Sequence, residues 1–396
     1  MVTTAEQIRR YAGPAILSYG FRPFFLLGAV WAVLVVAIWL PMLTGSFDLP
    51  TAFAPPEWHV HELLYGYAPA IVAGFLLTAV PNWTGRLPVT GTPLLLLVLI
   101  WTCGRIAILF SSHIGTIIAA IVDLLFLASL SVVIAREILA GRNLGNLKVL
   151  VVVSLLFVGN AVFHWEAMSI QGSSGYGTRI GIGAMILLIM LIGGRIVPSF
   201  TRNWLARAHP GRLPIPANRF DAVAITVGAV AIPCWTALPQ AAPTAALAIA
   251  AGSLHAVRLG RWAGYRTAAE PLILVLHVAY AFVPIGFLLL ALAIAVPSMV
   301  VAGGTLHAWT VGAIGTMTLA VMTRASLGHT GQALIASPAT QLIYIAIIIA
   351  AATRIVAAFD IWREGLLTVS AAVWGAEVRG VVSSFWPLFV KRRTGD

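Results

Sequence analysis

The sequence consists largely of unbroken apolar runs of about 20 residues, and these runs constrain the fold more than any other feature. A run of this length spans the hydrocarbon core of a bilayer as a single α-helix. Only 9% of the residues are charged, whereas a soluble globular protein has about 25%. We therefore expect an all-α, polytopic membrane bundle. The short alternating segments of a membrane β-barrel do not occur.

The apolar runs predict twelve transmembrane helices. Their ranges are 20–42, 58–81, 91–110, 114–138, 147–167, 179–200, 218–238, 242–258, 270–296, 299–325, 339–359 and 366–390. Pro233, Pro239 and Pro243 interrupt the seventh and eighth runs. Eleven spans is therefore the alternative.

Basic residues fall in alternate segments between the runs and so predict the orientation of the chain. They are Arg9, Arg10, Arg86, Arg136, Arg142, Lys148, Arg202, Arg207, Arg212, Arg219, Arg258, Arg261, Arg266, Arg324, Lys391, Arg392 and Arg393. The intervening segments 47–57, 238–243 and 295–304 contain no Lys or Arg. By the positive-inside rule, both termini face the cytoplasm. The net charge of +11 thus reflects membrane topology, and we expect a lipid bilayer, not nucleic acid, as the partner.

The chain is expected to form a single membrane domain over residues 1–396. Within it, 1–200 is the first half, 201–219 a basic cytoplasmic loop and 220–396 the second half. The second, sixth and tenth helices end similarly on the cytoplasmic side, with TAVPNWTGR, GGRIVPSFTRNW and MTRASLGHTG. Two explanations are open: arginines that snorkel to the surface, or a shared cytoplasmic site.

Six of the nine histidines lie inside or at the end of predicted spans. They are His59, His61, His164, His277, His307 and His329. A buried ionisable residue in a membrane helix is costly and usually has a partner or a function. Each ring alone could serve as an interhelical hydrogen-bonder. Six together, with few carboxylates nearby, favour cofactor binding, because imidazole is the natural nitrogen ligand of haem iron and copper.

The remaining histidines and both cysteines are expected to have no special role. His113 lies in an outer turn, His209 in the basic loop and His255 near the cytoplasmic end of the eighth span. Cys103 and Cys234 lie in apolar runs without a CxxC partner, so they are predicted to be packed residues.

Depth in the membrane sorts the six histidines into two groups. His59, His61, His164 and His307 belong to the outer side and are the predicted outer centre, with His59, His61 and His307 as its metal ligands. His277 and His329 belong to the cytoplasmic side and are the predicted inner centre. The 22 residues between His307 and His329 correspond to about 33 Å of helix, so these two cannot bind one ion.

The spacing of His59 and His61 limits how they bind a metal. Residues two apart point about 200° apart on a regular helix. Both reach one ion only if His59 lies in an irregular start, which Pro55 and Pro56 make plausible. Glu62 has three open roles: orienting a ligating imidazole, relaying a proton, or pairing with an arginine.

Further polar residues in the spans are predicted to support these centres. Asn160 lies one turn before His164, and Tyr280 lies three residues after His277. Arg195 and Arg324 could bind haem propionates or simply snorkel to the surface. Gly193 and Gly194 permit close helix packing or the close approach of a planar cofactor.

Several motifs together resemble the NnrS family over essentially the whole chain. They start at FRPFF, Phe21–Phe25, and continue as WHVHE, GFLLTAVPNWTG, GGRIVPSF and LHAWTVGAIGTMTLAVMTRASLGHTG. The family positions are His59, His61, Glu62, Asn82, Trp83, Thr84, Gly85, Gly193, Gly194, Arg195, His307, Arg324, His329, Thr330 and Gly331, and His277 also fits the pattern.

The resemblance implies a twelve-span protein of the bacterial inner membrane that carries haem, expected to be b-type, and copper. It also implies a link to denitrification and to tolerance of nitric oxide and nitrosative stress. It does not assign histidines to cofactors. The expected function is binding or redox handling of nitric oxide, with quinol or another electron donor as a partner and oxidoreductase activity left open. The alternatives are a transporter for copper, haem or a nitrosylated small molecule, and a non-catalytic accessory that protects or assembles metalloenzymes.

Overall fold

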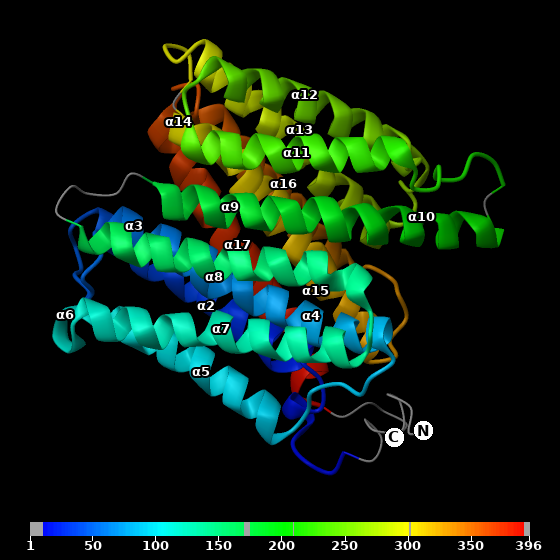
Figure 1. The fold of residues 1–396 in the computed structure, drawn as a ribbon, viewed down its shortest axis with the longest axis horizontal. Helices are drawn as coiled ribbons and strands as arrows, with labels where there is room; N and C mark the ends of the chain where they lie inside the picture. Colours follow the sequence, from blue (N-terminus) through cyan, green and yellow to red (C-terminus); the bar gives the residue numbers. More distant parts are fainter. Residues whose placement is uncertain (1–10, 170–174, 209, 301, 392–396) are drawn as a thin grey trace. The chain divides into compact units, whose positions relative to one another are not determined.

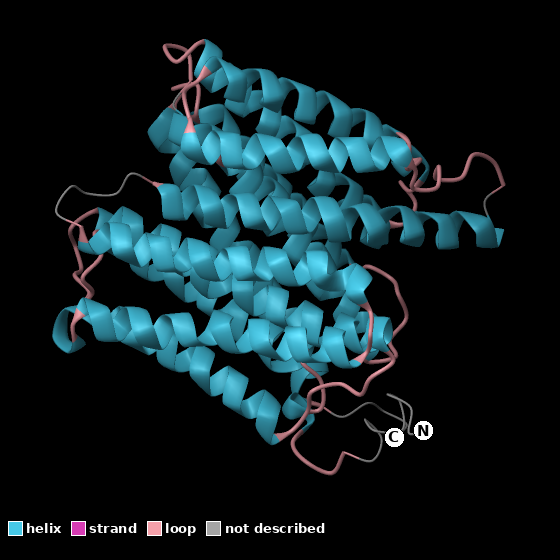
Figure 2. Cartoon of the chain, in the orientation of Figure 1, coloured by secondary structure: helices cyan, strands magenta, loops and turns pink. Residues whose placement is uncertain are grey.

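The computed structural model describes residues 11–169, 175–208, 210–300 and 302–391. Its regular elements are helices, and no strand occurs in these ranges, as Figures 1 and 2 show. The predicted all-α class is therefore confirmed. Arg9, Arg10, His209, Arg392 and Arg393 lie outside the described residues.

Long helices occupy the positions of all twelve predicted spans, and short segments join or interrupt them. In chain order the elements are η1 Ala15–Leu17, α2 Phe21–Leu43, α3 Pro55–His61, η2 Glu62–Tyr67, α4 Ala68–Thr84, α5 Thr92–Leu109, α6 Ser111–Ile114, α7 Thr116–Ala140, η3 Leu144–Asn146, α8 Leu147–Met168, α9 Tyr176–Leu188, η4 Ile189–Gly193, α10 Gly194–Ala208, α11 Arg219–Ala237, α12 Ala242–Gly260, η5 Gly264–Arg266, α13 Pro271–Ala295, α14 Ala302–Thr305, η6 Ala308–Gly315, α15 Thr316–His329, α16 Pro338–Ala357 and α17 Arg363–Val390.

Ten of the helical stretches are long and apolar enough to cross a membrane. The helices α12 and α17 fill the other two predicted positions but are not among these ten. Several long helices begin with proline in their first turn, as at Pro55, Pro243, Pro271 and Pro338. Proline is tolerated there because the first helical N–H groups have no intrahelical acceptor.

The helices pack into two compact units, which we describe separately. The first unit contains residues 1–181, 322–333 and 378–396, and the second contains 182–321 and 334–377. In the first, α7 packs along α5 and α8, and α4 along α2. In the second, α12 packs between α11 and α13, and η6 packs on α13 and α16. The units follow packing and not chain order, so the two predicted halves around the 201–219 loop remain a prediction.

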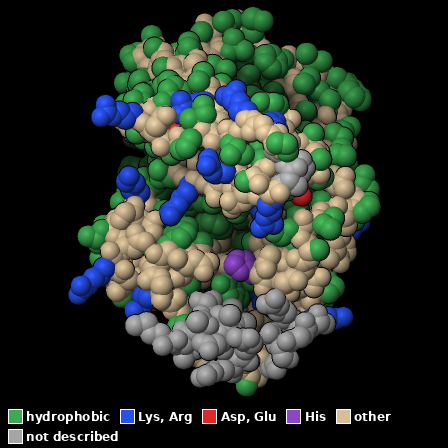
Figure 3. Space-filling model, turned by 90° about the vertical axis from the view of Figure 1, so that its right-hand side faces the viewer, with side chains coloured by type: hydrophobic (Ala, Val, Ile, Leu, Met, Phe, Trp, Pro, Cys, Tyr) green, Lys and Arg blue, Asp and Glu red, His purple; other side chains and the backbone are tan. Residues whose placement is uncertain are grey.

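The PNWTG motif closes the predicted cytoplasmic end of the second span. Gly85 caps α4 in a left-handed conformation, φ 69°, with its N–H on the Pro81 carbonyl. Arg86 then pairs with Glu137 of α7 at 2.5 Å. In Figure 3, Lys and Arg side chains are frequent on the face shown and few acidic side chains are visible, a distribution in keeping with a cytoplasmic surface.

The second, sixth and tenth spans each contain a π-helical segment. These are η2, η4 and η6, and the three spans that contain them are the most buried of the ten candidates. A π segment leaves backbone carbonyls outside the regular helical pattern, and such segments are frequent at functional sites. The three helices with similar cytoplasmic ends therefore also share an irregular interior.

Candidate metal centre

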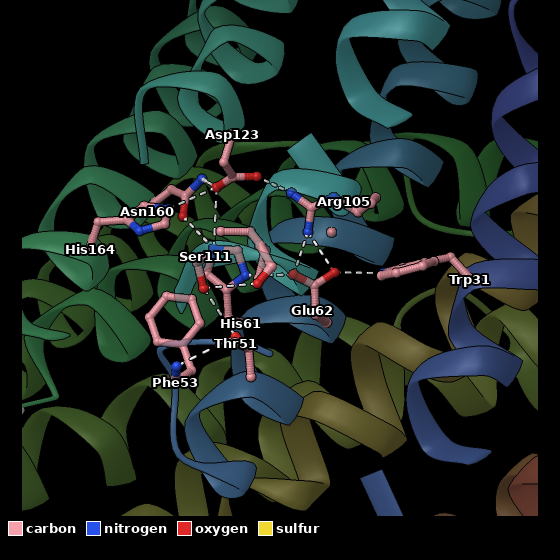
Figure 4. A network of polar contacts seen from close by, with 12 residues as sticks. Trp31, Thr51, Phe53, His61, Glu62, Arg105, Ser111, Asp123, Asn160 and His164 are labelled. Atoms are coloured by element: carbon pink, nitrogen blue, oxygen red, sulfur yellow. Dashed lines mark hydrogen bonds and ion pairs between the residues drawn. The ribbon is translucent and has the colours of Figure 1, made fainter. Parts of the chain in front are cut away.

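A buried set of polar side chains lies inside the first unit, and we call it the first polar cluster (Figure 4). Five spans contribute to it. Its members are Trp31 of α2, His61 of α3, Glu62 of η2, Arg105 of α5, Asp123 of α7, and Asn160 and His164 of α8. The ionisable members are between 0% and 4% exposed, so their charges must be balanced within the protein.

Arg105 links the two carboxylates of the cluster. It donates to both oxygens of Glu62, at 2.8 and 2.7 Å, and to Oδ1 of Asp123. Trp31 Nε1 donates to Glu62 Oε2 at 2.7 Å. Hydrogen bonds that involve charged groups are the strong ones, and here they fix both acidic side chains.

His61 lies between the same two carboxylates. Its Nδ1 is 2.9 Å from Glu62 Oε1, and its Nε2 is 3.2 Å from Asp123 Oδ2 and 3.1 Å from Asn160 Oδ1. All three are acceptors, because the Asn160 amide nitrogen donates to Asp123. A ring with hydrogen on both nitrogens satisfies this geometry. His61 and Arg105 then balance Glu62 and Asp123, so the cluster is neutral as a whole.

His164 completes the cluster from one turn beyond Asn160. Its Nε2 donates to Asp123 Oδ2 at 2.9 Å. The ring therefore carries its hydrogen on Nε2, and Nδ1 has no hydrogen bond among the described residues. Asp123 Oδ2 thus faces Asn160 and two imidazole nitrogens.

The geometry of these groups fits a metal ion. One nitrogen each of His61 and His164 and an oxygen of Asp123 lie within 4.8 Å of one another. Two imidazoles and a carboxylate suit a first-row transition metal. An ion would replace the hydrogens that now lie between these atoms. Glu62 would orient His61 through Nδ1, as carboxylates orient many metal-binding histidines. Of its three predicted roles, Glu62 is seen to pair with an arginine, Arg105, and orienting a ligating imidazole stays a prediction.

A small pocket lies beside the cluster. Its lining includes His164, Phe53, Ser111 and Met168, and its volume is about 20 Å³. Phe53 also stacks on the His61 ring, with ring centres 5.2 Å apart. A volume of this size holds a single molecule as small as water.

The π segment makes room for Arg105. A Cβ on Gly66 of η2 would lie 2.6 Å from the Arg105 guanidinium and 3.0 Å from Glu62. The Gly66 carbonyl accepts a hydrogen bond of 2.9 Å from Trp101 Nε1. Glycine and the π geometry therefore allow a buried ion pair against the helix backbone.

His59 points to a different neighbour from His61. Its ring stacks on Trp39 of α2, with centres 4.0 Å apart, and is half-buried. The backbone at this position is already helical, so the irregular start that would bring both rings to one ion is absent here. Of the four histidines predicted for the outer centre, the structure brings His61 and His164 together in the first unit.

His307 is the member of that predicted group in the second unit. Its Nδ1 donates to the Gly304 carbonyl at 3.1 Å, so Nε2 carries the lone pair. Many metal-binding histidines are held this way. His307 directly precedes η6, as His61 directly precedes η2.

The two histidines predicted for the inner centre have different environments. The Thr201 hydroxyl donates to the Val197 carbonyl, so His277 Nε2 donates to Thr201 Oγ1 at 2.8 Å. His277 Nδ1 has no hydrogen bond among the described residues and lies against Gly264. His329, in the first unit, is exposed at the end of α15 and stacks on Tyr19, with centres 5.3 Å apart.

A second polar cluster is built in the second unit from Met190, Asp221, His255, Arg258 and Tyr280. Arg258 donates to Asp221 at 2.9 Å, to the Met190 carbonyl of η4 at 2.9 Å and to the Tyr280 hydroxyl at 2.7 Å. Tyr280 Oη is 2.8 Å from His255 Nδ1. Tyr280 therefore bonds His255 and Arg258, whereas the sequence placed it beside His277.

Gly194 explains how Arg258 fits into this unit. A Cβ there would lie 2.3 Å from the guanidinium. The predicted close approach thus occurs at Gly194, where the planar group is an arginine side chain, whereas a Cβ on Gly193 would make only ordinary contacts. Arg195 is exposed and Arg324 is half-buried, and their predicted roles toward haem propionates stay predictions.

Several members of the two clusters were not singled out from the sequence. Arg105, the partner of Asp123, was missed. The signal was present, because Arg105 near the end of one span and Asp123 near the start of the next lie at the same depth in an antiparallel pair. The same reasoning, applied to α11 and α12, would have paired Asp221 with Arg258. It would also have identified His255, three residues before Arg258, as a neighbour of this pair.

The family model described as NnrS protein matches residues 15–393. The chain belongs to the NnrS family. No curated protein and no solved structure matches the chain. Membership supports a membrane protein related to nitric oxide. The family motifs of this NnrS-family chain contain two of the cluster residues, His61 and Glu62, which lie at the start of the π segment η2.

Proposed function

We propose that this chain is a haem- and copper-binding protein of the bacterial inner membrane that binds nitric oxide and handles it by redox chemistry. The observation that carries the proposal is the His61–Asp123–His164 group beside a pocket for one small molecule. A diatomic ligand fits such a pocket, whereas a sugar or nucleotide does not. Family membership supports the same chemistry in general terms.

Different residues of the chain would hold the two centres. His61, His164 and Asp123 would hold copper, and His307, with Nδ1 fixed by Gly304, would offer Nε2 to a second centre. Bound haem and copper would supply one-electron chemistry and an open position for nitric oxide. Glu62 would still accept the Nδ1 hydrogen of His61 and so keep a proton near the pocket. Quinol or another donor would supply electrons.

Visible absorption spectra of the purified full-length protein test this proposal, recorded oxidised and reduced, with and without nitric oxide, alongside metal analysis. We expect haem bands that shift on addition of nitric oxide, and bound copper. His164→Gln should weaken the nitric oxide response or lower the copper content, because His164 lines the pocket. His113→Gln is the matched control, since His113 is exposed in an outer turn.

The alternatives give different outcomes. Bound cofactors with no turnover of nitric oxide would indicate the accessory role. Protein with neither haem nor copper would overturn the proposal and favour a transport path lined by histidines. A His164→Gln variant that keeps both copper and the nitric oxide response would remove the first polar cluster from the site.

A further inference from the structure

The second polar cluster repeats the plan of the first. In each, a glycine in or directly after a π segment makes room for a buried arginine, Gly66 for Arg105 and Gly194 for Arg258. In each, that arginine pairs with an aspartate from a neighbouring helix. In each, a histidine is hydrogen-bonded to a residue that the arginine contacts, His61 to Glu62 and His255 to Tyr280. The first cluster presents a candidate metal centre, which raises the question of what the second one binds.

His255 supplies the atom that the second cluster leaves without a partner. The ring is 0% exposed, and Nε2 has no hydrogen bond among the described residues. The carbonyl of Ala224 in α11 lies close to the His255 ring. An unpaired buried nitrogen is costly, so this atom is a candidate ligand.

The thioether of Met190 shares the same space. A Cβ on Gly228 of α11 would lie 2.9 Å from Met190 Sδ and 3.1 Å from His255 Nε2. Both atoms therefore pack against α11 at Gly228, where an added Cβ would clash with them. The Met190 side chain is fully buried and flexible enough to adjust its sulfur position.

An imidazole nitrogen and a thioether sulfur in a dry interior suit a soft, monovalent ion. Asp221 already pairs with Arg258 at 2.9 Å and with Arg261 at 3.6 Å, so the cluster has no spare negative charge for an ion. A monovalent ion therefore adds one buried charge and a divalent ion two, and the smaller cost favours the former. Tyr280, held by Arg258, would accept the Nδ1 hydrogen and orient the ring.

We propose that His255 Nε2 and Met190 Sδ form a Cu(I) site in the second unit, where both side chains pack against Gly228 of α11. This site is separate from the His61–Asp123–His164 group and does not depend on its function. Asp221 and Arg258 lie near the predicted cytoplasmic ends of α11 and α12. Copper in a reducing cytoplasm is Cu(I).

Anaerobic titration with Cu(I), in competition with a chromogenic Cu(I) chelator, tests the site on the full-length, metal-stripped protein. Cys103 and Cys234 are replaced by alanine first, because free thiols also bind Cu(I). We expect His255→Gln and Met190→Leu each to remove the same single equivalent, and the double variant to remove no more. X-ray absorption should show a sulfur neighbour of copper that Met190→Leu abolishes.

Gly228→Ala and Met317→Leu complete the design. Gly228→Ala keeps both ligands, but its methyl group would displace both side chains from α11, so it should weaken Cu(I) binding at least tenfold. Met317→Leu removes another buried thioether of the unit, one that lies near Gly193, and should change nothing. Full Cu(I) binding with an unchanged sulfur signal in Met190→Leu would overturn the proposal. The spectra of the His164→Gln variant report on the other centre and are unaffected by either outcome.

Discussion

Arg105 determines whether the first polar cluster is tolerable inside a membrane protein. Its guanidinium contacts Glu62 and Asp123 at once, and it is 3% exposed. A buried ion pair contributes little net stability compared with apolar packing. Removing one partner of such a pair is costly, because it leaves the other charge buried and unpaired.

Arg105→Met should therefore lower the free energy of unfolding by about 3–5 kcal/mol, since it leaves two carboxylates and one imidazolium in place. The measurement is thermal unfolding of the detergent-solubilised protein followed by tryptophan fluorescence. Arg136→Met is the control: its side chain is 75% exposed and its nearest carboxylate is 3.9 Å away, so the change should stay within about 0.5 kcal/mol. Equal effects of the two variants would contradict this account of Arg105.

At the scale of elements, the π segments connect the sequence motifs to the polar clusters. The second and sixth spans use a glycine at the π segment to let an arginine approach the backbone, and a π-segment carbonyl accepts a side-chain N–H in each. The tenth span contains η6, and there Gly312 and Gly315 pack against Phe282 and Trp374 instead. Close approach of side chains, which an added Cβ would obstruct, thus explains Gly66, Gly194 and Gly312.

Gly66→Ala and Gly194→Ala should each destabilise the protein by about 1–3 kcal/mol, the usual cost of overpacking a filled interior. Gly260→Ala provides the comparison, because a Cβ on that helical glycine meets nothing within 4 Å. Alanine there should be neutral or stabilising by up to about 1 kcal/mol. The same thermal unfolding assay decides: wild-type stability in Gly194→Ala would show that Arg258 does not occupy that space.

For the whole molecule, the charge distribution predicts how the chain crosses the membrane. Ten helices are long and apolar enough to span it, and α12 and α17 lie at the two further predicted positions. An even number of spans puts both termini on the same side of the membrane. The positive-inside rule predicts that this side is the cytoplasm. The exposed loops between helices allow this to be tested residue by residue.

Single cysteines introduced at Ser46 and Gln332 test the topology. Both positions are exposed, Ser46 after α2 and Gln332 after α15. In a background without Cys103 and Cys234, Ser46→Cys should react with a membrane-impermeant maleimide once the outer membrane is permeabilised. Gln332→Cys should react only after the inner membrane is broken. Labelling of Gln332→Cys before that step would reverse the orientation or change the number of spans.

The sequence by itself determined the class, the approximate helix positions and the family. These follow from apolar run length, from alternating loop charge and from long motifs in order, all of which are local along the chain. The sequence also identified His61, Glu62, Asn160 and His164 as candidate site residues, because polar groups in apolar spans are conspicuous.

Only the tertiary structure decided which of these residues meet. Arg105, Asp123 and Trp31 lie in one cluster with His61, and His59 stacks on Trp39. Tyr280 hydrogen-bonds to His255 and Arg258 and not to His277. The structure also showed that three spans contain π segments, which no local pattern had predicted. The physical reason is that helix rotation and π geometry depend on packing between spans, and a shift of one residue turns a side chain by about 100° to a different neighbour.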